Sequence, residues 1–202
     1  MSFIQHVLDQ FIATPFWEWI AFLFALTQVF LAYLNKPQNF YAGILSVVIY
    51  AWLFFEAGLY AESLLNLYYL VISITGIFIW TRTSNPNPIS YSTAKQLFIA
   101  FTIFVVSLGV IFYVLKNYTP STVPFQDALV ASIAWSGSWL LMKRKIENWL
   151  VLNVSNLIAI PLQYSKGLEL TSLLTVVYFI MGIAGYWKWR KIIKANSDVI
   201  AL

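Results

Sequence analysis

The chain has 202 residues, of which 60% are hydrophobic and only 10% are charged, with no cysteine and one histidine. A soluble domain carries about 25% charged residues, so this composition excludes a fully water-exposed surface and predicts a membrane protein. The absence of cysteine excludes disulfides and thiolate metal sites, and the lone His6 excludes a histidine-clustered metal centre. We therefore expect no metal and no other cofactor.

Seven apolar runs approach the length of about 20 residues that a membrane-spanning helix needs. Ahead of them, residues 1–14 alternate apolar and polar side chains at helical spacing, which predicts an amphipathic helix on the membrane surface. The spans are expected near 15–34, 39–56, 61–81, 94–116, 126–142, 148–164 and 169–189. Asn, Pro and Ser content predicts loops at 83–92 and 117–124.

The positive residues predict the orientation of these spans. Of the twelve Lys and Arg residues, only Lys116 and Lys166 follow even-numbered spans, and the other ten follow odd-numbered ones. Because Lys and Arg are retained on the cytoplasmic side, we expect an outer N-terminus and a cytoplasmic tail at 192–202. The predicted location is the bacterial inner membrane, crossed several times.

Residues 31–82 and 140–191 align without a gap at an offset of 109. The identical pairs include Asn39/Asn148, Ser46/Ser155, Gly76/Gly185 and Trp80/Trp189. A single transmembrane domain is thus expected, with a first three-helix repeat at 15–82, a connector helix and loops at 83–123, and a second repeat at 124–191. Because a single helix connects them, both repeats have the same orientation in the membrane, as in SWEET-type sugar transporters. Such repeats enclose a site between them. The prediction is an all-α transporter of seven transmembrane helices, a 3+1+3 parallel repeat with SWEET-like architecture.

Polar and aromatic residues inside the spans are the candidate substrate-binding residues, because a polar group in hydrocarbon usually faces a cavity or another helix. Trp149, Asn153 and Asn156 share one face of the sixth span and are the first choices. The remaining candidates are Asn66, Tyr69, Tyr178, Ser73, Trp135, Trp139 and Gln28. Aromatic rings in a cavity suit a flat or cationic ring. The alternative, which we favour for any single Ser or Thr, is that these groups join helices.

The residue types and motifs that the sequence lacks limit the possible transport mechanisms. No Asp, Glu, Lys or Arg lies in the middle of a span, so we expect facilitated diffusion without ion coupling. No G-x-x-x-x-G-K-[ST] motif occurs, which excludes direct ATP drive by this chain. A retinal-binding receptor would need a lysine in the middle of the last span. Lys188 lies at the end of that span, which argues against such a receptor. An intramembrane enzyme would need paired acids, clustered histidines or an activated nucleophile, so we expect no enzyme.

Three segments resemble the Pnu family of bacterial vitamin transporters: Gly58–Tyr69 (GLYAESLLNLYY), Lys145–Asn156 (KIENWLVLNVSN, followed by Ile160-Pro-Leu162) and Gly185–Arg190 (GYWKWR). The resemblance covers nearly the whole chain. It implies seven spans in a SWEET-like arrangement, a site at mid-membrane, and uptake by facilitated diffusion. It also implies that a cytoplasmic kinase traps the vitamin by phosphorylation.

The chain departs from the riboside-type pattern of that family at three positions. Leu152 replaces a second Trp, Asn156 replaces an acid, and Gly76-Ile77 replaces a Gly-Trp pair. We therefore expect thiamine as the substrate, with nicotinamide riboside as the alternative and riboflavin or another vitamin third. The expected partners are this vitamin, the lipid bilayer and, functionally, the kinase, with no nucleic acid. The sequence is compatible with a homo-oligomer.

Overall fold

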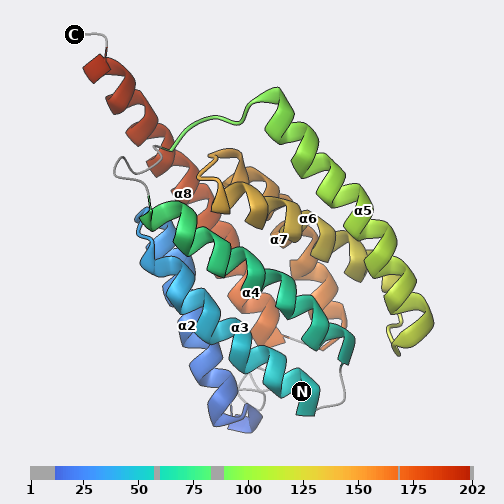
Figure 1. Ribbon diagram of the computed structural model, residues 1–202. Coiled ribbons are helices and arrows are strands. Elements are labelled where there is room, and N and C mark those ends of the chain that lie inside the picture. The colour runs from blue at the N-terminus through green and yellow to red at the C-terminus, as the bar shows by residue number, and fades with distance from the viewer. Residues whose placement is uncertain (1–11, 57–59, 83–88, 168, 201–202) are drawn as a thin grey trace.

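The computed structural model describes residues 12–56, 60–82, 89–167 and 169–200. Within these ranges the chain forms long α-helices and no β-strand. The helices are α2 (Phe16–Tyr33), α3 (Gln38–Glu56), α4 (Tyr60–Thr81), α5 (Ala94–Tyr118), α6 (Pro124–Met142), α7 (Glu147–Ser165) and α8 (Glu169–Ile200) (Figure 1). The expected seven-helix, all-α membrane fold is confirmed. The amphipathic helix expected at 1–14 falls almost wholly on residues outside the described ranges.

Two features of the helices differ from simple apolar spans. α8 continues to Ile200 and its last turns project beyond the other helices (Figure 1), because its polar C-terminal stretch contains no Gly or Pro to end it. Among the residues searched, α2, α3 and α5 are long and apolar enough to cross a membrane by composition alone. The polar residues of α6, α7 and α8 lower their hydropathy, and several of them face other helices rather than lipid.

The helices form two triplets. Helices α2, α3 and α4 pack together, as do α6, α7 and α8, and the last helix of each triplet packs on the first helix of the other. α5 packs mainly on α6 at the edge of the molecule (Figure 1). Adding 109 to the bounds of α3, Gln38–Glu56, gives those of α7, Glu147–Ser165. The Trp80 Nε1–H at the end of α4 donates to the Met142 carbonyl oxygen at the end of α6, so both triplets run the same way, and the expected 3+1+3 parallel repeat is confirmed.

Equivalent serines join the helices within each triplet. Ser46 Oγ donates to the Ala21 carbonyl oxygen at 2.9 Å, and its repeat mate Ser155 Oγ donates to that of Val130, also at 2.9 Å. A second equivalent pair of bonds is Ser63 to Ala51 and Ser172 to Ile160. All four acceptors are related by the same offset as the donors. Since lipid offers no hydrogen bonds, hydroxyls that bond neighbouring helices are satisfied inside the protein and hold the helices in register.

Four rings pack where the triplets meet, and we call Phe40, Trp80, Trp149 and Trp189 the aromatic cluster. Phe40 contacts Trp80 edge-to-face at 5.0 Å, and their mates Trp149 and Trp189 repeat this at 5.5 Å. Trp80 and Trp189 join the two pairs at 6.4 Å between centroids. All four side chains are at most 3% exposed. The close packing depends on two glycines, because a Cβ at Gly76 would overlap the Phe40 ring and one at Gly185 would lie 2.5 Å from the Trp149 ring.

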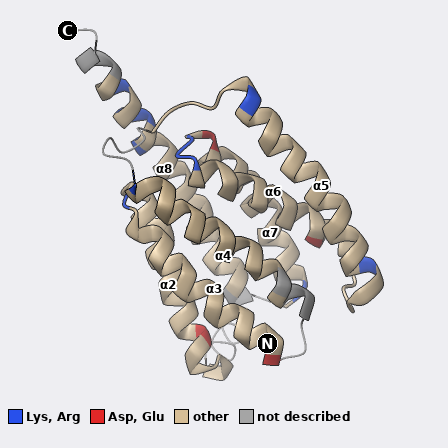
Figure 2. Ribbon diagram, in the orientation of Figure 1, with Lys and Arg blue, Asp and Glu red and all other residues tan. Residues whose placement is uncertain are grey.

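Most Lys and Arg residues gather at one end of the molecule, which we call the basic end, at the C-terminal ends of α4, α6 and α8 (Figure 2). The Arg144 guanidinium lies 4.0 Å from the Trp80 ring centroid, and burial lowers the pKa of Arg144. Lys145 Nζ donates to Ser90 Oγ, and the Glu147 carboxylate accepts from the backbone N–H and hydroxyl of Ser92. These contacts fasten the segment before α5 to the turn between α6 and α7.

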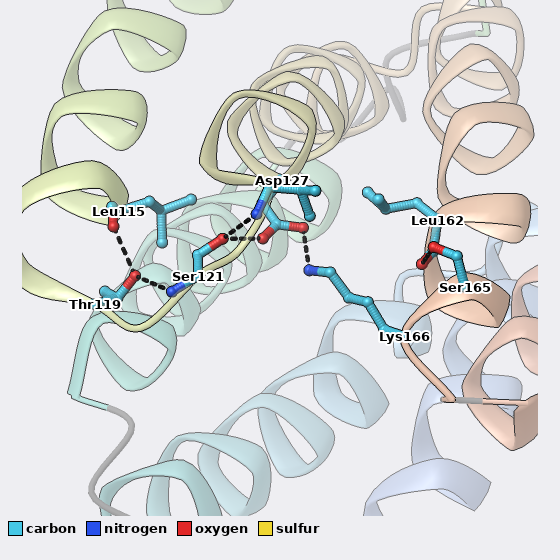
Figure 3. A network of polar contacts seen from close by, with 8 residues as sticks. Leu115, Thr119, Ser121, Asp127, Leu162, Ser165 and Lys166 are labelled. Atoms are coloured by element: carbon cyan, nitrogen blue, oxygen red, sulfur yellow. Dashed lines mark hydrogen bonds and ion pairs between the residues drawn. The ribbon is translucent and has the colours of Figure 1, made fainter.

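A separate polar network (Figure 3) lies where α5 and α7 end and α6 begins, opposite the basic end. Asp127, in the first turn of α6, accepts a hydrogen bond from Ser121 Oγ and forms an ion pair with Lys166 at the end of α7. Thr119 Oγ1 donates to the Leu115 carbonyl oxygen and so joins the same loop to α5. The network therefore ties three helices of the second half together outside the membrane core.

The glycine contacts within the triplets can be tested by adding one methyl group. We expect Gly76→Ala to lower the melting temperature of the purified protein by several degrees, because overpacking a close contact costs about 1–3 kcal/mol. Gly109→Ala in α5 is the matched control, since a Cβ there meets nothing within 4 Å. Equal melting temperatures for the two variants would contradict the proposed role of the contact.

Candidate functional site

A cavity of about 370 Å³ lies between the two triplets. Its wall includes residues from α2, α3, α4, α6, α7 and α8, whereas none of the lining residues comes from α5. The volume falls within the range of small-molecule sites, about 300–1,000 Å³. No Asp, Glu, Lys or Arg occurs among the lining residues in the described part of the chain. The cavity thus has the size of a small-molecule site, and its described walls carry no formal charge.

The aromatic cluster separates this cavity from the basic end. Phe40 and Trp149 line the cavity, while Trp80 and Trp189 pack behind them and do not. The glycine contacts bring α4 and α8 close enough for the rings to fill the space between the triplets. The floor of the cavity is therefore aromatic, and it presents one indole to anything bound above it.

Helix α7 contributes more polar lining residues than any other helix. Trp149, Asn153 and Asn156 follow one another at spacings of four and three residues, which places them on one helix face. Asn156 Nδ2 donates to Asn153 Oδ1 over a long 3.4 Å, so the two amides act as one polar patch. Farther along the same helix, Gln163 Oε1 accepts a hydrogen bond from Thr175 Oγ1 of α8 at 2.7 Å. All four of these α7 side chains line the cavity.

The other triplet and α8 supply a second set of polar and aromatic groups. Tyr69 of α4 and Tyr178 of α8 are repeat mates, and both line the cavity. Ser73 lines it one turn from Tyr69, and its mate Gly182 does so in α8. A Cβ at Gly182 would overlap the side-chain amide of Asn153, so this glycine leaves the space that the amide occupies.

Seven of the ten residues predicted from the sequence thus line one cavity, while three do not. The lining seven are Trp149, Asn153, Asn156, Tyr69, Tyr178, Ser73 and Gln28. Trp135 instead stacks on Tyr68 at 4.1 Å, and its carbonyl oxygen accepts from the Tyr68 hydroxyl. That contact joins α6 to α4. Asn66 and Trp139 are partly buried but also lie outside the lining.

Six polar lining residues are absent from the ten predicted from the sequence: Ser46, Tyr50, Ser138, Ser155, Gln163 and Thr175. Two of these carried a usable signal, because they differ in polarity from their repeat mates: Tyr50 pairs with Ala159, and Ser138 pairs with Val29. The same loss of repeat identity marks Asn153 and Asn156. Breaks in the repeat therefore mark several of the polar lining residues, although identical mates such as Tyr69 and Tyr178 also line the cavity.

Comparisons with known proteins agree with this architecture. A solved structure titled "Crystal structure of the Vitamin B3 transporter PnuC" superposes with a TM-score of 0.72, covering 95% of this chain and 88% of that one at 24% identity. This likeness shows a shared fold. Two proteins described as "Nicotinamide riboside transporter PnuC" are also similar. The one from Escherichia coli is 22% identical over 187 residues, 79% of this chain and 78% of its own length.

The second relative, from Neisseria mucosa, is 25% identical over 200 residues, which cover 89% of this chain and 75% of its own. The family model described as "Nicotinamide mononucleotide transporter" matches residues 15–191. These residues hold both triplets, the connector and every lining residue of the cavity. The chain therefore belongs to the nicotinamide mononucleotide transporter family.

Proposed function

We propose that this protein carries nicotinamide riboside, a vitamin with a cationic aromatic ring and no phosphate, across the bacterial inner membrane. The observation that carries the proposal is the uncharged cavity wall. A phosphate group buried without a cation would lose its hydration and gain no charge-assisted partner. The family description names a mononucleotide, whereas the relatives are described as riboside transporters. A riboside, which has no phosphate, suits the uncharged wall better.

The cavity residues suit the parts of that substrate. The Trp149 indole lies at the floor of the cavity. An indole ring attracts a cationic ring such as a pyridinium when water is excluded. Asn153 and Asn156 offer donors and acceptors for a carboxamide or for ribose hydroxyls. Tyr69 and Tyr178 add aromatic walls in the two triplets. Aromatic and amide groups thus supply both stacking and hydrogen bonds without a fixed charge.

Thiamine, the substrate expected first from the sequence, remains a second candidate. The comparisons give it no support, whereas they support the riboside. The observation that favours it is that Leu152 and Asn156, which replace the Trp and the acid of the riboside-type pattern, both line the cavity. The third departure, at Ile77, packs against the aromatic cluster and is not a lining residue.

We further propose a mechanism of facilitated diffusion, with the basic end in the cytoplasm and trapping by a cytoplasmic kinase. Lys and Arg at one end of the molecule support this orientation (Figure 2). Among the described residues, the lining contains no carboxylate that could bind a proton or sodium ion, which supports transport without ion coupling. In this mechanism the concentration gradient drives entry and phosphorylation prevents return.

A ligand panel tests the substrate. We expect calorimetry on the purified protein to show binding of nicotinamide riboside, and at least hundredfold weaker binding of nicotinamide mononucleotide, about 2.7 kcal/mol. Thiamine and riboflavin complete the panel. Tight binding of the mononucleotide would contradict the argument from the uncharged wall, and preference for thiamine would replace the riboside by the second candidate.

A single amide tests the polar patch on α7. We expect Asn156→Leu to weaken riboside binding at least tenfold, about 1.4 kcal/mol, with little change in melting temperature. Its matched control is Asn117→Leu, because Asn117 is exposed near the end of α5 and its amide donates to the Tyr113 carbonyl oxygen of the same helix. An unchanged dissociation constant for Asn156→Leu would remove this residue from the site.

Transport in liposomes tests the energetics. At a membrane potential held at zero, we expect labelled riboside to equilibrate across the bilayer and not to accumulate in response to a proton or sodium gradient. A riboside kinase with ATP inside the liposomes should convert equilibration into accumulation of the phosphorylated product. Accumulation of unmodified riboside driven by an ion gradient alone would show coupling that the mechanism lacks.

A further inference from the structure

Gln28 of α2 is a cavity residue whose surroundings differ between the two triplets. Its side chain lines the cavity and lies over Gly43 of α3. A Cβ at Gly43 would stand 2.9 Å from the Gln28 amide carbon and 3.0 Å from its nitrogen. The absence of a side chain at Gly43 therefore creates the space in which the amide sits.

The second triplet has the same contact with large and small residues exchanged. The repeat mate of Gln28 is Gly137, and that of Gly43 is Leu152. A Cβ at Gly137 would lie 2.8 Å from Leu152 Cδ2. One large side chain thus fills the crossing of the first and second helices in each triplet, but α2 supplies an amide where α7 supplies a hydrocarbon. Either arrangement would fill the space between the two helices, so packing alone does not explain the amide of Gln28.

The repeat also fixes the depth of the Gln28 amide. Gly43, beneath the amide, corresponds to Leu152, which is next to Asn153 on α7. Neighbouring residues on a helix differ in height by about 1.5 Å, so the Gln28 and Asn153 amides lie at nearly the same depth. They come from different triplets and both line the cavity. Two primary amides therefore face the chamber at one level above the aromatic floor.

We propose that Gln28 is a specificity-determining residue that, opposite Asn153, binds the amide-like edge of the substrate's heterocycle. A primary amide carries two N–H donors and one carbonyl acceptor, which matches a ligand edge with a donor next to an acceptor. The carboxamide of nicotinamide riboside has such an edge, and so does an aminopyrimidine. This assignment rests on the proposed function for the carboxamide, but the amide-like edge is shared by both candidate substrates.

The repeat supplies the test variant. The double substitution Gln28→Gly with Gly43→Leu reproduces in the first triplet the packing that Gly137 and Leu152 already provide in the second, while it removes the amide. We expect this variant to keep the wild-type melting temperature and to bind nicotinamide riboside at least tenfold more weakly. Gln28→Met, which keeps the bulk at the original position, is the second variant should the double one fail to fold. Thr27→Val, on the exposed side of α2, is the control.

A second ligand separates recognition from packing. Pyridine riboside, which lacks the carboxamide, should bind the wild type and either variant within twofold. Equal weakening of both ligands, or no weakening of either, would overturn the proposal. If the wild type binds thiamine and not nicotinamide riboside, the proposed riboside function fails. The role of Gln28 then stands only if the same substitution weakens thiamine binding at least tenfold.

Discussion

Two contacts between a glycine and an aromatic ring hold the structure together at the point where its triplets meet. Gly76 lies against Phe40, and Gly185 lies against Trp149. Because no Cβ stands between them, the third helix of each triplet approaches the second closely enough for Trp80 and Trp189 to meet. The position of the cavity floor follows from this packing, since the first two rings line the cavity and the other two support them.

Many residues that repeat build the frame of this fold, whereas the amide side chains of its cavity do not repeat. Identical pairs such as Ser46/Ser155 and Trp80/Trp189 make equivalent hydrogen bonds or ring contacts and build the frame twice. The amide side chains of the cavity are unmatched, because Gln28 pairs with Gly137 and Asn153 pairs with Ile44. Two identical walls could match only a ligand with two-fold symmetry. The divergence lets a symmetric frame enclose a site for a molecule with two different ends.

The sequence predicted the frame better than the site for a physical reason. The length of an apolar segment and the side of the membrane on which Lys and Arg lie are properties of whole segments. They can be predicted without knowing how each helix is rotated about its own axis. A site residue depends on that rotation. Trp135 and Trp149 both lie within predicted spans, yet one stacks on Tyr68 between helices and the other faces the cavity. The polar face of α7 could be identified because the equivalent positions of α3 are apolar. No comparable contrast showed which way the Trp135 side chain of α6 would point.

The uncharged wall has a consequence for direction as well as for choice of substrate. Under the proposed function, entry and trapping depend on the same absence of cations from the lining. A phosphate added in the cytoplasm carries about −1.5 to −2 charges at neutral pH. The described lining holds no Lys or Arg that could offset the lost hydration of this group. The phosphorylated vitamin is then a poor ligand from the inside. A carrier of this kind needs no built-in directionality, because a kinase that changes the charge of the substrate makes net transport one-way.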